Sequence, residues 1–354
     1  MDGDVMAWRG TTANPVEVAV FSPVVLDWRA KLARLEGAYA ETTIRGYGSD
    51  FAAFERWCVR ERQTALPASP ETVAEFITAC ANGSDRCDQS GSQGSGDAPS
   101  TLARRLSAIR KVHRLLRMAS PVEDEEVKTA LRRAIRAKGR RQHQAHGLTI
   151  DIREALIAAC SLQSLMGLRD RAVVAVGYDT LCRRSELVAL RLADLTDNPD
   201  GSVTVLVRRS KADALGDGRT AFLTPRTALL LYAWLHAAGI EEGPLFRSLT
   251  RNELGREALN PCSVSRILKR AAERAGYDDA LVAELSSHSL RIGAAQDMSS
   301  ADFGILALMA AGGWKTVAVV SRYVEKALVA HVGRTREARL EKRFGAPGER
   351  KPND

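Results

Sequence analysis

The sequence predicts a mainly α-helical protein of two domains, the second of which carries a small antiparallel β-sheet. Three observations lead to this fold class. Apolar residues recur every three or four positions along most of the 354-residue chain, as on the buried face of a helix. Two strands are indicated, a segment rich in valine at 202–209 and a second segment at 219–223 that follows a glycine-rich turn. A polar, basic stretch near residue 140 separates two series of helical segments.

The first domain is expected to be all-helical and to cover residues 23–138, after a flexible tail at 1–22. Its helices are predicted at 26–35, after Thr42, after Ser69 and at 101–118. Ser69 followed by Pro70 indicates a helix start, because the serine side chain can cap the helix and proline suits the first turn. The Gly-, Ser- and Asp-rich stretch 82–99 is interpreted as a loop within the domain, since similar helical sequence resumes directly after it.

The second domain is expected at residues 148–345, between an interdomain linker at 139–147 and a flexible tail at 346–354. Two strands joined by a glycine-rich turn are predicted in its middle, which is too little strand for a doubly wound sheet. Asn260 is the expected cap of one helix. The predicted helices are at 151–159, 169–181, 184–190, 225–238, 261–275, 290–298, 302–311, 316–329 and near 335–343.

Charge and cysteine content narrow the class of protein. Fifty-one Lys and Arg against 43 Asp and Glu give a net charge of +8, which favours a polyanionic partner without requiring one. The six cysteines show neither zinc-ligand spacing nor a disulfide pattern. No apolar run reaches the ~18 residues that span a membrane, and no signal sequence is recognisable. We therefore expect a soluble, cytoplasmic protein with no membrane partner.

Basic residues are concentrated between Arg104 and Arg141. Thirteen Lys and Arg lie in this stretch, and only the four acidic residues from Glu123 to Glu126 oppose them. A solvated helix face is one explanation. A surface that follows the phosphates of a nucleic acid is the other, and the clustering favours it.

Four short patches in the second domain carry side chains suited to chemistry on a phosphate. They are YDTLCRRSEL at 178–187, RSKA at 209–212, SHSLRIGAA at 287–295, and GGW at 312–314 followed nine residues later by Arg322 and Tyr323. Each has an ordinary structural explanation when taken singly: a surface arginine pair, a core histidine or an interfacial tyrosine. Their occurrence together and in this order is far more specific.

Cutting and rejoining DNA without a cofactor requires this set of residue types. The transition state places extra negative charge on the phosphate oxygens, and the planar fork of arginine is well suited to bind it. Lysine or histidine can deliver a proton to the departing 5′-oxygen. A tyrosine nucleophile would store the energy of the broken bond in a phosphotyrosyl ester.

With these patches the sequence resembles the tyrosine recombinases, the phage-integrase family, and most closely the Cre-type recombinases. The patches YDTLCRRSEL, SHSLRIGAAQDM and AGGWKTVAVVSRYVEK carry the resemblance, which extends from about residue 25 through segments such as FERWC and TLARRLSAIRKVHR. It implies a site-specific recombinase that works through a 3′-phosphotyrosyl intermediate and a Holliday junction. Tyr323 would be the nucleophile, Arg183 and Arg291 would clamp the scissile phosphate, and Glu186 would support Arg183.

The resemblance implies three further catalytic residues. Lys211, on the β-hairpin, would protonate the leaving 5′-oxygen. His288 would assist proton transfer around the tyrosine. Trp314 stands where many members of the family have histidine and where Cre-type enzymes have tryptophan, and its indole N–H can still donate to the phosphate. No metal or other cofactor is implied, because the cations are side chains.

The resemblance also implies a two-domain clamp around double-stranded DNA and a homotetramer that joins two DNA sites, each with inverted half-sites. The charged helix after Tyr323 would dock on a neighbouring subunit, or else be a solvated terminal helix. Residues that could read bases lie on two helices, although phosphate contact is as plausible for each of them. They are Arg104 and Arg105 on the first helix, and Ser263, Ser265, Arg266 and Lys269 on the second.

Two alternatives stay open at this point. One is a sequence-specific DNA-binding protein that has lost catalysis, although none of the family's catalytic residue types is missing here. The other is an enzyme of related chemistry, either a type IB topoisomerase or a telomere resolvase.

Overall fold

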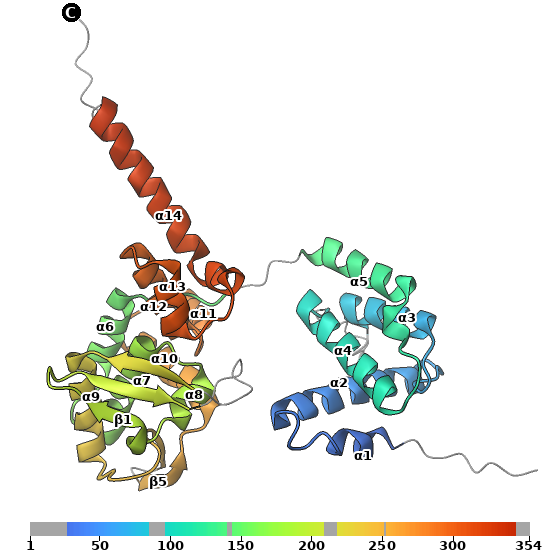
Figure 1. The fold of residues 1–354 in the computed structure, drawn as a ribbon, viewed down its shortest axis with the longest axis horizontal. Helices are drawn as coiled ribbons and strands as arrows, with labels where there is room; N and C mark the ends of the chain where they lie inside the picture. The colour runs from blue at the N-terminus through green and yellow to red at the C-terminus, as the bar shows by residue number, and fades with distance from the viewer. Residues whose placement is uncertain (1–26, 85–95, 140–143, 209–217, 251–252, 345–354) are drawn as a thin grey trace, which may run out of the picture. The chain divides into compact units, whose positions relative to one another are not determined.

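The chain forms two compact units, Met1–Gln142 and His143–Asp354 (Figure 1). The computed structural model describes residues 27–84, 96–139, 144–208, 218–250 and 253–344. Each unit has its own hydrophobic core, so each is described by itself. The mainly helical fold class predicted from the sequence is confirmed.

The described part of the first unit is helical. Ser69 accepts a hydrogen bond from the backbone N–H of Thr72 and so caps α3, as predicted. The Asp124 side chain caps α5, a helix that the sequence analysis did not delimit. The helices are α1 (Trp28–Ala33), α2 (Glu41–Arg60), α3 (Pro70–Asn82), α4 (Pro99–Leu115), the short 3-10 helix η2 (Pro121–Glu123) and α5 (Glu125–Lys138).

Aromatic side chains form the centre of this first core. Phe51, Phe54 and Trp57 recur along one face of α2, as their spacing predicted. Phe54 packs at 5.0 Å, and Trp57 at 5.4 Å, from the ring of Phe76 on α3. Trp28 brings α1 onto the same cluster at 4.9 Å from Phe51. Rings of this size remove much apolar surface from water, so the core holds α1, α2 and α3 together.

The second unit is a helical body with two small antiparallel sheets. Its α-helices are α6 (Ile150–Ala159), α7 (Leu165–Thr180), α8 (Arg184–Ala189), α9 (Pro225–Ala237), α10 (Pro261–Arg274), α11 (Asp279–Glu284), α12 (Ser289–Ser300), α13 (Ile305–Gly312) and α14 (Val317–Phe344), and a 3-10 turn η3 spans Leu192–Asp194. Its strands are β1 (Leu195–Asp197), β2 (Val203–Val207), β3 (Arg219–Leu223), β4 (Arg247–Thr250) and β5 (Glu253–Ala258).

The larger sheet has the order β1-β2-β3. Val203 pairs with Leu223 and Val207 pairs with Arg219, so the two strands predicted from the sequence form one antiparallel hairpin. Helix α7 packs against α9, α12 and β3, and its segment 172–176 is completely buried. The C-terminal end of α7 is therefore held in place between the sheet and α12.

Some sequence predictions were wrong or incomplete. Two helices were predicted at 316–329 and near 335–343, whereas α14 is one continuous helix. Gly333 lies inside it with open space around it, and a single glycine lowers helix stability by about 1 kcal/mol without ending the helix. Strands β1, β4 and β5 and helix α11 were not predicted. They are short, and β5 is largely exposed, so they lack a clear apolar period.

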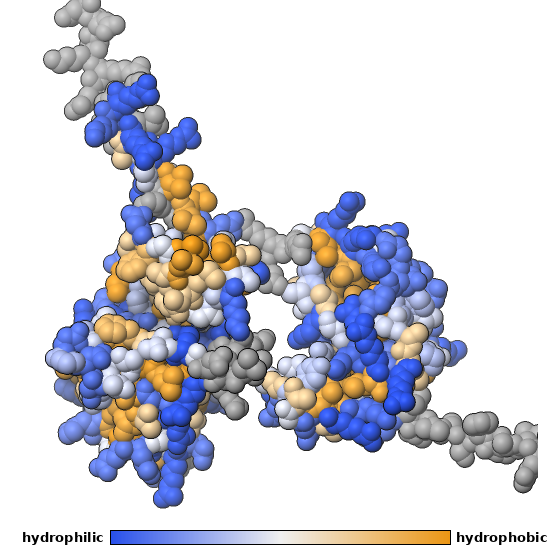
Figure 2. Space-filling model, in the orientation of Figure 1, coloured by the Kyte–Doolittle hydropathy of each residue, from blue (hydrophilic) through white to orange (hydrophobic). Residues whose placement is uncertain are grey.

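Apolar side chains are exposed on α13 and along part of α14, where Figure 2 shows a hydrophobic patch. Leu306, Val329 and Val332 are among the most exposed large apolar residues described. Among the described residues, only α13 taken together with the first part of α14 is long and apolar enough to cross a membrane, and this pair is bent by 97°.

Candidate functional site

Arg183 is fixed at the junction between α7 and α8. Helix α7 ends with Leu181 in the left-handed conformation, and Arg183 is the N-cap residue of α8. Glu186, in the first turn of α8, accepts from the backbone N–H of Arg183 at 3.0 Å and from its guanidinium at 2.6 Å. The Glu186 side chain is only 3% exposed. A buried carboxylate therefore orients the Arg183 guanidinium, which is partly exposed.

Arg291 lies on α12 and is completely buried. Its guanidinium donates to the carbonyl of Leu181, at the end of α7, and to the carbonyl of Gly312 at 2.5 Å, at the end of α13. Burial, followed by the charge of Arg183, lowers the pKa of Arg291 to about 10. The site thus holds a positive charge whose hydrogen-bond partners here are neutral carbonyls.

Trp314 and Tyr323 complete the same cluster. The guanidinium carbon of Arg291 lies 4.3 Å from the Trp314 ring centroid and 5.8 Å from that of Tyr323. Both distances are within the ~6 Å at which cation–π attraction contributes. The centroids of the two rings are 5.0 Å apart. Within the described residues, the buried indole N–H of Trp314 has no hydrogen-bond acceptor. Most buried polar groups have a partner, so this donor requires an explanation.

Backbone geometry sets the position of Trp314. Helix α13 ends at Gly312, and Gly313 adopts a φ of +60° that turns the chain toward α14. A Cβ atom on Gly312 would come within 2.2 Å of the Trp314 ring. The two glycines of the GGW patch are therefore required by the turn and by the packed indole.

His288 is the N-cap residue of α12 and is only partly exposed. Partial burial of the imidazole lowers its pKa, and the charge of Arg291 lowers it further. Arg183 and Arg184 act in the same direction. The imidazole therefore stays neutral at neutral pH, when one of its nitrogens can accept a proton.

One predicted catalytic residue cannot be placed. Lys211 lies outside the described residues, between β2 and β3. At the base of the same hairpin, however, the structure contains a partly buried arginine that sequence reasoning missed: Arg219, the first residue of β3. It contacts the carbonyl of Thr180, next to the Arg183 loop. The sequence shows only that this position is an arginine at the start of a strand, opposite Val207 in the hairpin. Neither feature predicts that the side chain is partly buried.

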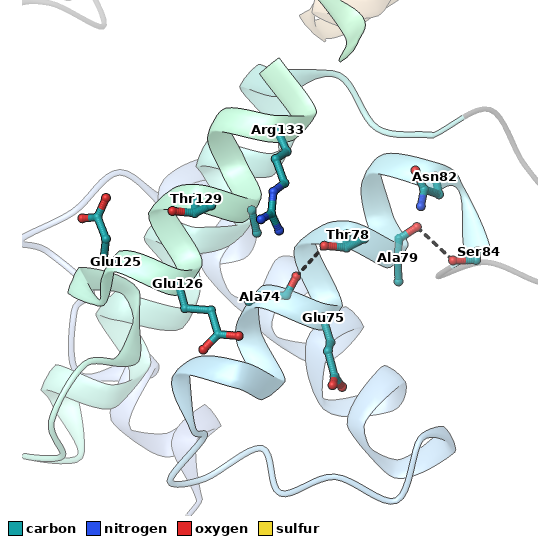
Figure 3. A pocket seen from close by; sticks show the side chains of 11 residues that line it. Ala74, Glu75, Thr78, Ala79, Asn82, Ser84, Glu125, Glu126, Thr129 and Arg133 are labelled. Carbon is teal, nitrogen blue, oxygen red and sulfur yellow. Dashed lines mark hydrogen bonds between the residues drawn. The ribbon is translucent and has the colours of Figure 1, made fainter. Parts of the chain in front are cut away.

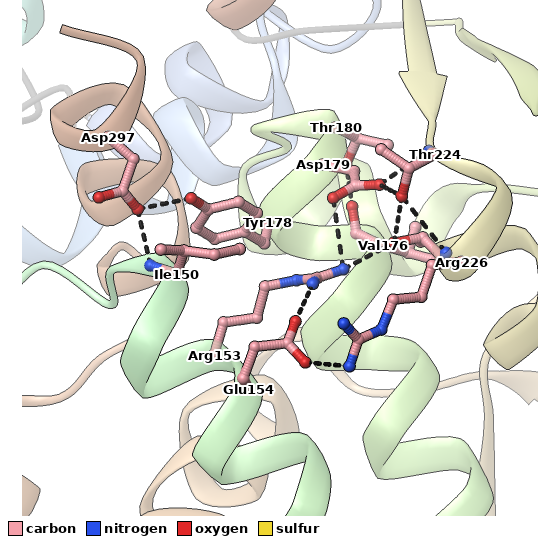
Figure 4. A network of polar contacts seen from close by, with 11 residues as sticks. Ile150, Arg153, Glu154, Val176, Tyr178, Asp179, Thr180, Thr224, Arg226 and Asp297 are labelled. Carbon is pink, nitrogen blue, oxygen red and sulfur yellow. Dashed lines mark hydrogen bonds and ion pairs between the residues drawn. The ribbon is translucent and has the colours of Figure 1, made fainter. Parts of the chain in front are cut away.

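A second polar network joins α7, which leads to the Arg183 loop, to neighbouring helices (Figure 4). The Tyr178 hydroxyl donates to Asp297 on α12 at 2.5 Å, and Asp297 also accepts from the backbone N–H of Ile150. Burial and the bond to Asp297 raise the pKa of Tyr178. Tyr178 is therefore a structural tyrosine that joins α7 to α12 and α6. It lies five residues before Arg183 but is poorly suited to attack a phosphate.

Arg153 and Asp179 extend the network away from the cluster. Arg153 is buried and bonds the Thr227 hydroxyl at 2.7 Å and the Asp179 carboxylate at 3.5 Å. Asp179 in turn accepts from the backbone and hydroxyl of Thr224, at the start of α9 (Figure 4). These bonds fix α7 to α6 and α9, so the end of α7 that carries Leu181 is held from several sides.

The two arginines predicted to read bases on α4 differ in burial. Arg104 is 62% exposed and is held by Asp50 at 2.9 Å. Arg105 is 4% exposed, pairs with Asp97 at 2.6 Å and lies over the Phe76 ring. The prediction for Arg105 needs a correction, because in this structure its guanidinium faces the core of the unit. We retain Arg104 alone as a surface candidate.

The four candidates on α10 are partly or fully exposed, and all four also take part in hydrogen bonds within the unit. Arg266 is exposed and donates to the Ser263 hydroxyl at 2.8 Å. Ser265 accepts from the backbone N–H of Ser287 at 2.9 Å, and Lys269 donates to the carbonyl of Ala283 at 3.1 Å. Helix α10 therefore also supports the segment that leads to His288 and Arg291.

Acidic residues partly neutralise the basic stretch of the first unit. Glu123 pairs with Arg110 and Arg114, and Glu125 pairs with Lys128 and Arg132. Surface pairs of this kind are screened by salt and contribute little to stability. The four cations of these pairs lie at the surface, where the phosphates of DNA could replace the carboxylates as their partners.

A hollow of about 600 Å³ lies between α3 and α5 (Figure 3). Small side chains such as Ala74 and Thr78 line it, with Glu75 and Glu126 among its polar residues. Arg133 points from α5 toward α3 in Figure 3. The carboxylates make this hollow a poor place for a phosphate backbone, so we do not include it in the site.

Comparison with known proteins agrees with the sequence motifs. Residues 147–328 match the phage integrase family, and residues 30–119 match the N-terminal SAM-like domain of phage integrases. The chain is 32% identical to an integrase/recombinase XerD homolog of Selenomonas ruminantium, covering 83% of this chain and 84% of that protein. It is 25% identical to the Cre recombinase of Escherichia phage P1, covering 81% of this chain and 84% of that protein.

Solved structures show the same fold. XerH recombinase bound to a palindromic difH substrate after cleavage aligns with a TM-score of 0.61 at 16% identity, covering 85% of this chain and 80% of that chain. The Tn1549 transposon integrase in complex with transposon right-end DNA aligns with a TM-score of 0.57 at 13% identity, covering 88% of this chain and 99% of that chain.

Proposed function

The chain belongs to the phage integrase family and is a tyrosine recombinase, and from this premise we propose that Tyr323 is the nucleophile that attacks DNA. Its phenolic oxygen would bond to the scissile phosphorus while the bond from phosphorus to the 5′-oxygen breaks. The products are a 3′-phosphotyrosyl ester and a free 5′-hydroxyl. This hydroxyl then attacks the phosphotyrosyl phosphorus of the partner strand, and the bond from phosphorus to the tyrosine oxygen breaks, which releases the tyrosine. Two such exchanges, through a Holliday junction, recombine two sites.

The observation that carries this proposal is the packing of one buried guanidinium against two aromatic rings. Arg291 contacts the rings of both Trp314 and Tyr323, and Glu186 orients Arg183. The nucleophile therefore lies beside a fixed positive charge. Fixed cations stabilise a phosphoryl transition state more effectively than mobile ones, because they need not reorganise during the reaction.

Each remaining residue has a proposed part in the reaction. Arg183 and Arg291 would bind the non-bridging phosphate oxygens, and the unpartnered indole N–H of Trp314 would donate to one of them. Neutral His288 would accept the proton that leaves the Tyr323 hydroxyl. The proton that reaches the 5′-oxygen would come from Lys211, whose placement remains a prediction.

We propose double-stranded DNA with inverted half-sites as the partner. The relatives in complex with DNA support this partner, as does the basic excess of the chain. Arg104 and the α10 residues Ser263, Ser265, Arg266 and Lys269 are candidates for DNA contact. A homotetramer on two sites is proposed as well. The apolar residues exposed along α14, Val329 and Val332, suit docking of this helix on a neighbouring subunit.

Covalent trapping tests the nucleophile. Full-length protein is incubated with fragments of the DNA that flanks its own gene, denatured, and examined for a protein–DNA adduct. We expect an adduct with the wild type and none with Tyr323→Phe. Tyr232→Phe is the matched control, because Tyr232 is an accessible tyrosine of the same unit whose hydroxyl bonds Asp197; it should still form the adduct.

The products separate this proposal from its alternatives. Specific DNA binding without any adduct would indicate a binding protein without catalysis. Relaxation of plasmids that lack a specific site would indicate a topoisomerase, and hairpin-ended products would indicate a telomere resolvase. An adduct that persists in Tyr323→Phe would refute the assignment of the nucleophile.

A further inference from the structure

Arg219 bridges two separate parts of the catalytic unit. Its side chain is 11% exposed. One terminal nitrogen donates to the carbonyl of Ala311 at 3.0 Å, near the end of α13. The other donates to the carbonyl of Thr180 at 2.7 Å, at the end of α7. A residue of the β-hairpin thereby joins the ends of two helices that are far apart in the sequence.

Arg291 bridges the same two helix ends one residue further along. It donates to the carbonyls of Leu181 and Gly312, whereas Arg219 takes those of Thr180 and Ala311. Carbonyls in the last turn of a helix lack intrahelical partners and carry the negative end of the helix dipole. Two parallel arginines therefore stabilise both helix ends and hold them at a fixed separation.

The two helix ends lead directly to residues of the proposed phosphate site. Thr180 lies three residues before Arg183, and Ala311 lies three residues before Trp314. Arg219 also comes within 3.9 Å of the Glu186 carboxylate, which orients Arg183. A change at Arg219 would therefore alter the positions of both phosphate-binding groups together.

Close packing at Gly313 makes the bridge specific. A Cβ atom on Gly313 would lie 2.9 Å from Cδ of Arg219 and 3.2 Å from its Nε. Gly313 thus leaves room for the Arg219 side chain to reach α13, in addition to providing the positive φ of the turn. Lysine carries all its donors on one nitrogen, so it cannot match the fixed spacing with which the two terminal nitrogens of Arg219 reach the two carbonyls.

We propose that Arg219 is a positioning residue of the recombinase, which together with Arg291 sets the distance between the Arg183 loop and the Trp314 turn before DNA binds. The inference rests on the proposed function of those two residues. Arg219 itself would not contact the scissile phosphate. Its effect is preorganisation: displacing a binding group by about 1 Å can slow an enzymatic reaction ~100-fold.

Hydrogen–deuterium exchange of the full chain without DNA tests the bridge directly. We expect faster amide exchange in both 180–187 and 311–323 in Arg219→Lys and Arg219→Met than in the wild type. Arg171→Met is the matched control, because Arg171 also donates to two carbonyls at a helix end, those of Ile157 and Cys160 at the end of α6. It should leave both segments unchanged. Unchanged exchange in the Arg219 variants would overturn the proposal.

Adduct formation on the DNA trapped by the wild type tests the consequence. We expect both Arg219 variants to bind this DNA normally and to form the adduct about 100-fold more slowly. If Arg219→Lys formed the adduct at the wild-type rate, the positive charge at position 219 would be sufficient without the two-carbonyl bridge. That result would overturn the proposal. An equal loss in Arg171→Met would overturn it too, since any arginine that bonds helix-end carbonyls would then have the same effect.

The two measurements distinguish failure of this inference from failure of the proposed function. If the wild type forms no adduct, the assignment of the nucleophile fails, while the exchange measurement still decides whether Arg219 fixes the two segments. If the wild type forms the adduct and the Arg219 variants match it in rate and exchange, the inference alone fails.

Discussion

Each unit of the molecule buries an arginine in its core, and the two arginines are held in different ways. Arg105 in the first unit pairs with the Asp97 carboxylate at 2.6 Å. Arg291 in the second unit is more deeply buried, but its hydrogen-bond partners among the described residues are the backbone carbonyls of Leu181 and Gly312. The first guanidinium is neutralised by a countercharge, whereas the second is held by backbone dipoles and by the rings of Trp314 and Tyr323.

This difference separates a structural charge from a functional one. A buried ion pair satisfies both partners and leaves no net charge for a ligand. A guanidinium held by carbonyls keeps its charge and its orientation, and its lowered pKa shows the cost of burial. Burying such a guanidinium lowers the stability of the free protein. In return, the guanidinium is already oriented when an anion binds, so the site is ready to bind phosphate.

The largest effect is expected from Arg105→Met. The substitution breaks the buried ion pair with Asp97, and breaking such a pair lowers the free energy of unfolding by about 3–5 kcal/mol. Urea unfolding followed by circular dichroism would measure it. Arg114→Met is the control, because this exposed arginine pairs with Glu123 at the surface and should change stability by less than about 1 kcal/mol. Equal losses in the two variants would show that the buried ion pair stabilises the first unit no more than a surface pair does.

A functional loss is expected from Arg291→Met. The variant lacks a fixed cation of the transition state, so adduct formation should slow by about 100- to 1,000-fold, or ~2.7–4 kcal/mol. Quantification of the adduct over time on the trapped DNA measures this, and a thermal melt checks that the variant is folded. Full activity in a folded Arg291→Met protein would contradict the role given to the unpaired charge.

The smallest effect concerns pH and one histidine in each unit. His113 is buried on α4 and accepts from the backbone N–H of Ala68 at 3.1 Å, and burial lowers its pKa. The pKa of His288 is lowered as well. The folded state therefore binds fewer protons than the unfolded chain. Stability should be intact above the ordinary histidine pKa of 6.5 and should decrease as the pH falls through it.

Melting temperatures measured between pH 8 and pH 5 test this prediction. His113→Gln should remove more of the decrease than His288→Gln, because protonation of His113 would also break its bond to Ala68, whereas His288 is more exposed. A decrease that is unaffected by either substitution would mean that other groups titrate.

Much of the fold and the composition of the site could be predicted from local sequence. The caps at Ser69 and Asn260 were predicted and are present, as is the hairpin of β2 and β3. The motif around Arg291 also identified the family correctly. These features depend on neighbouring residues or on a fixed order of residue types, and both can be read along the chain. The catalytic roles themselves stay predictions.

The sequence by itself determined the helical class, the caps and which residue types could act on a phosphate. The tertiary structure alone decided that Arg105 faces the core, that Arg219 joins the ends of α7 and α13, and that α14 continues as one helix. The physical reason is distance along the chain. Arg219 meets carbonyls 39 and 92 residues away, and the burial of an arginine depends on such long-range partners, which no local pattern specifies.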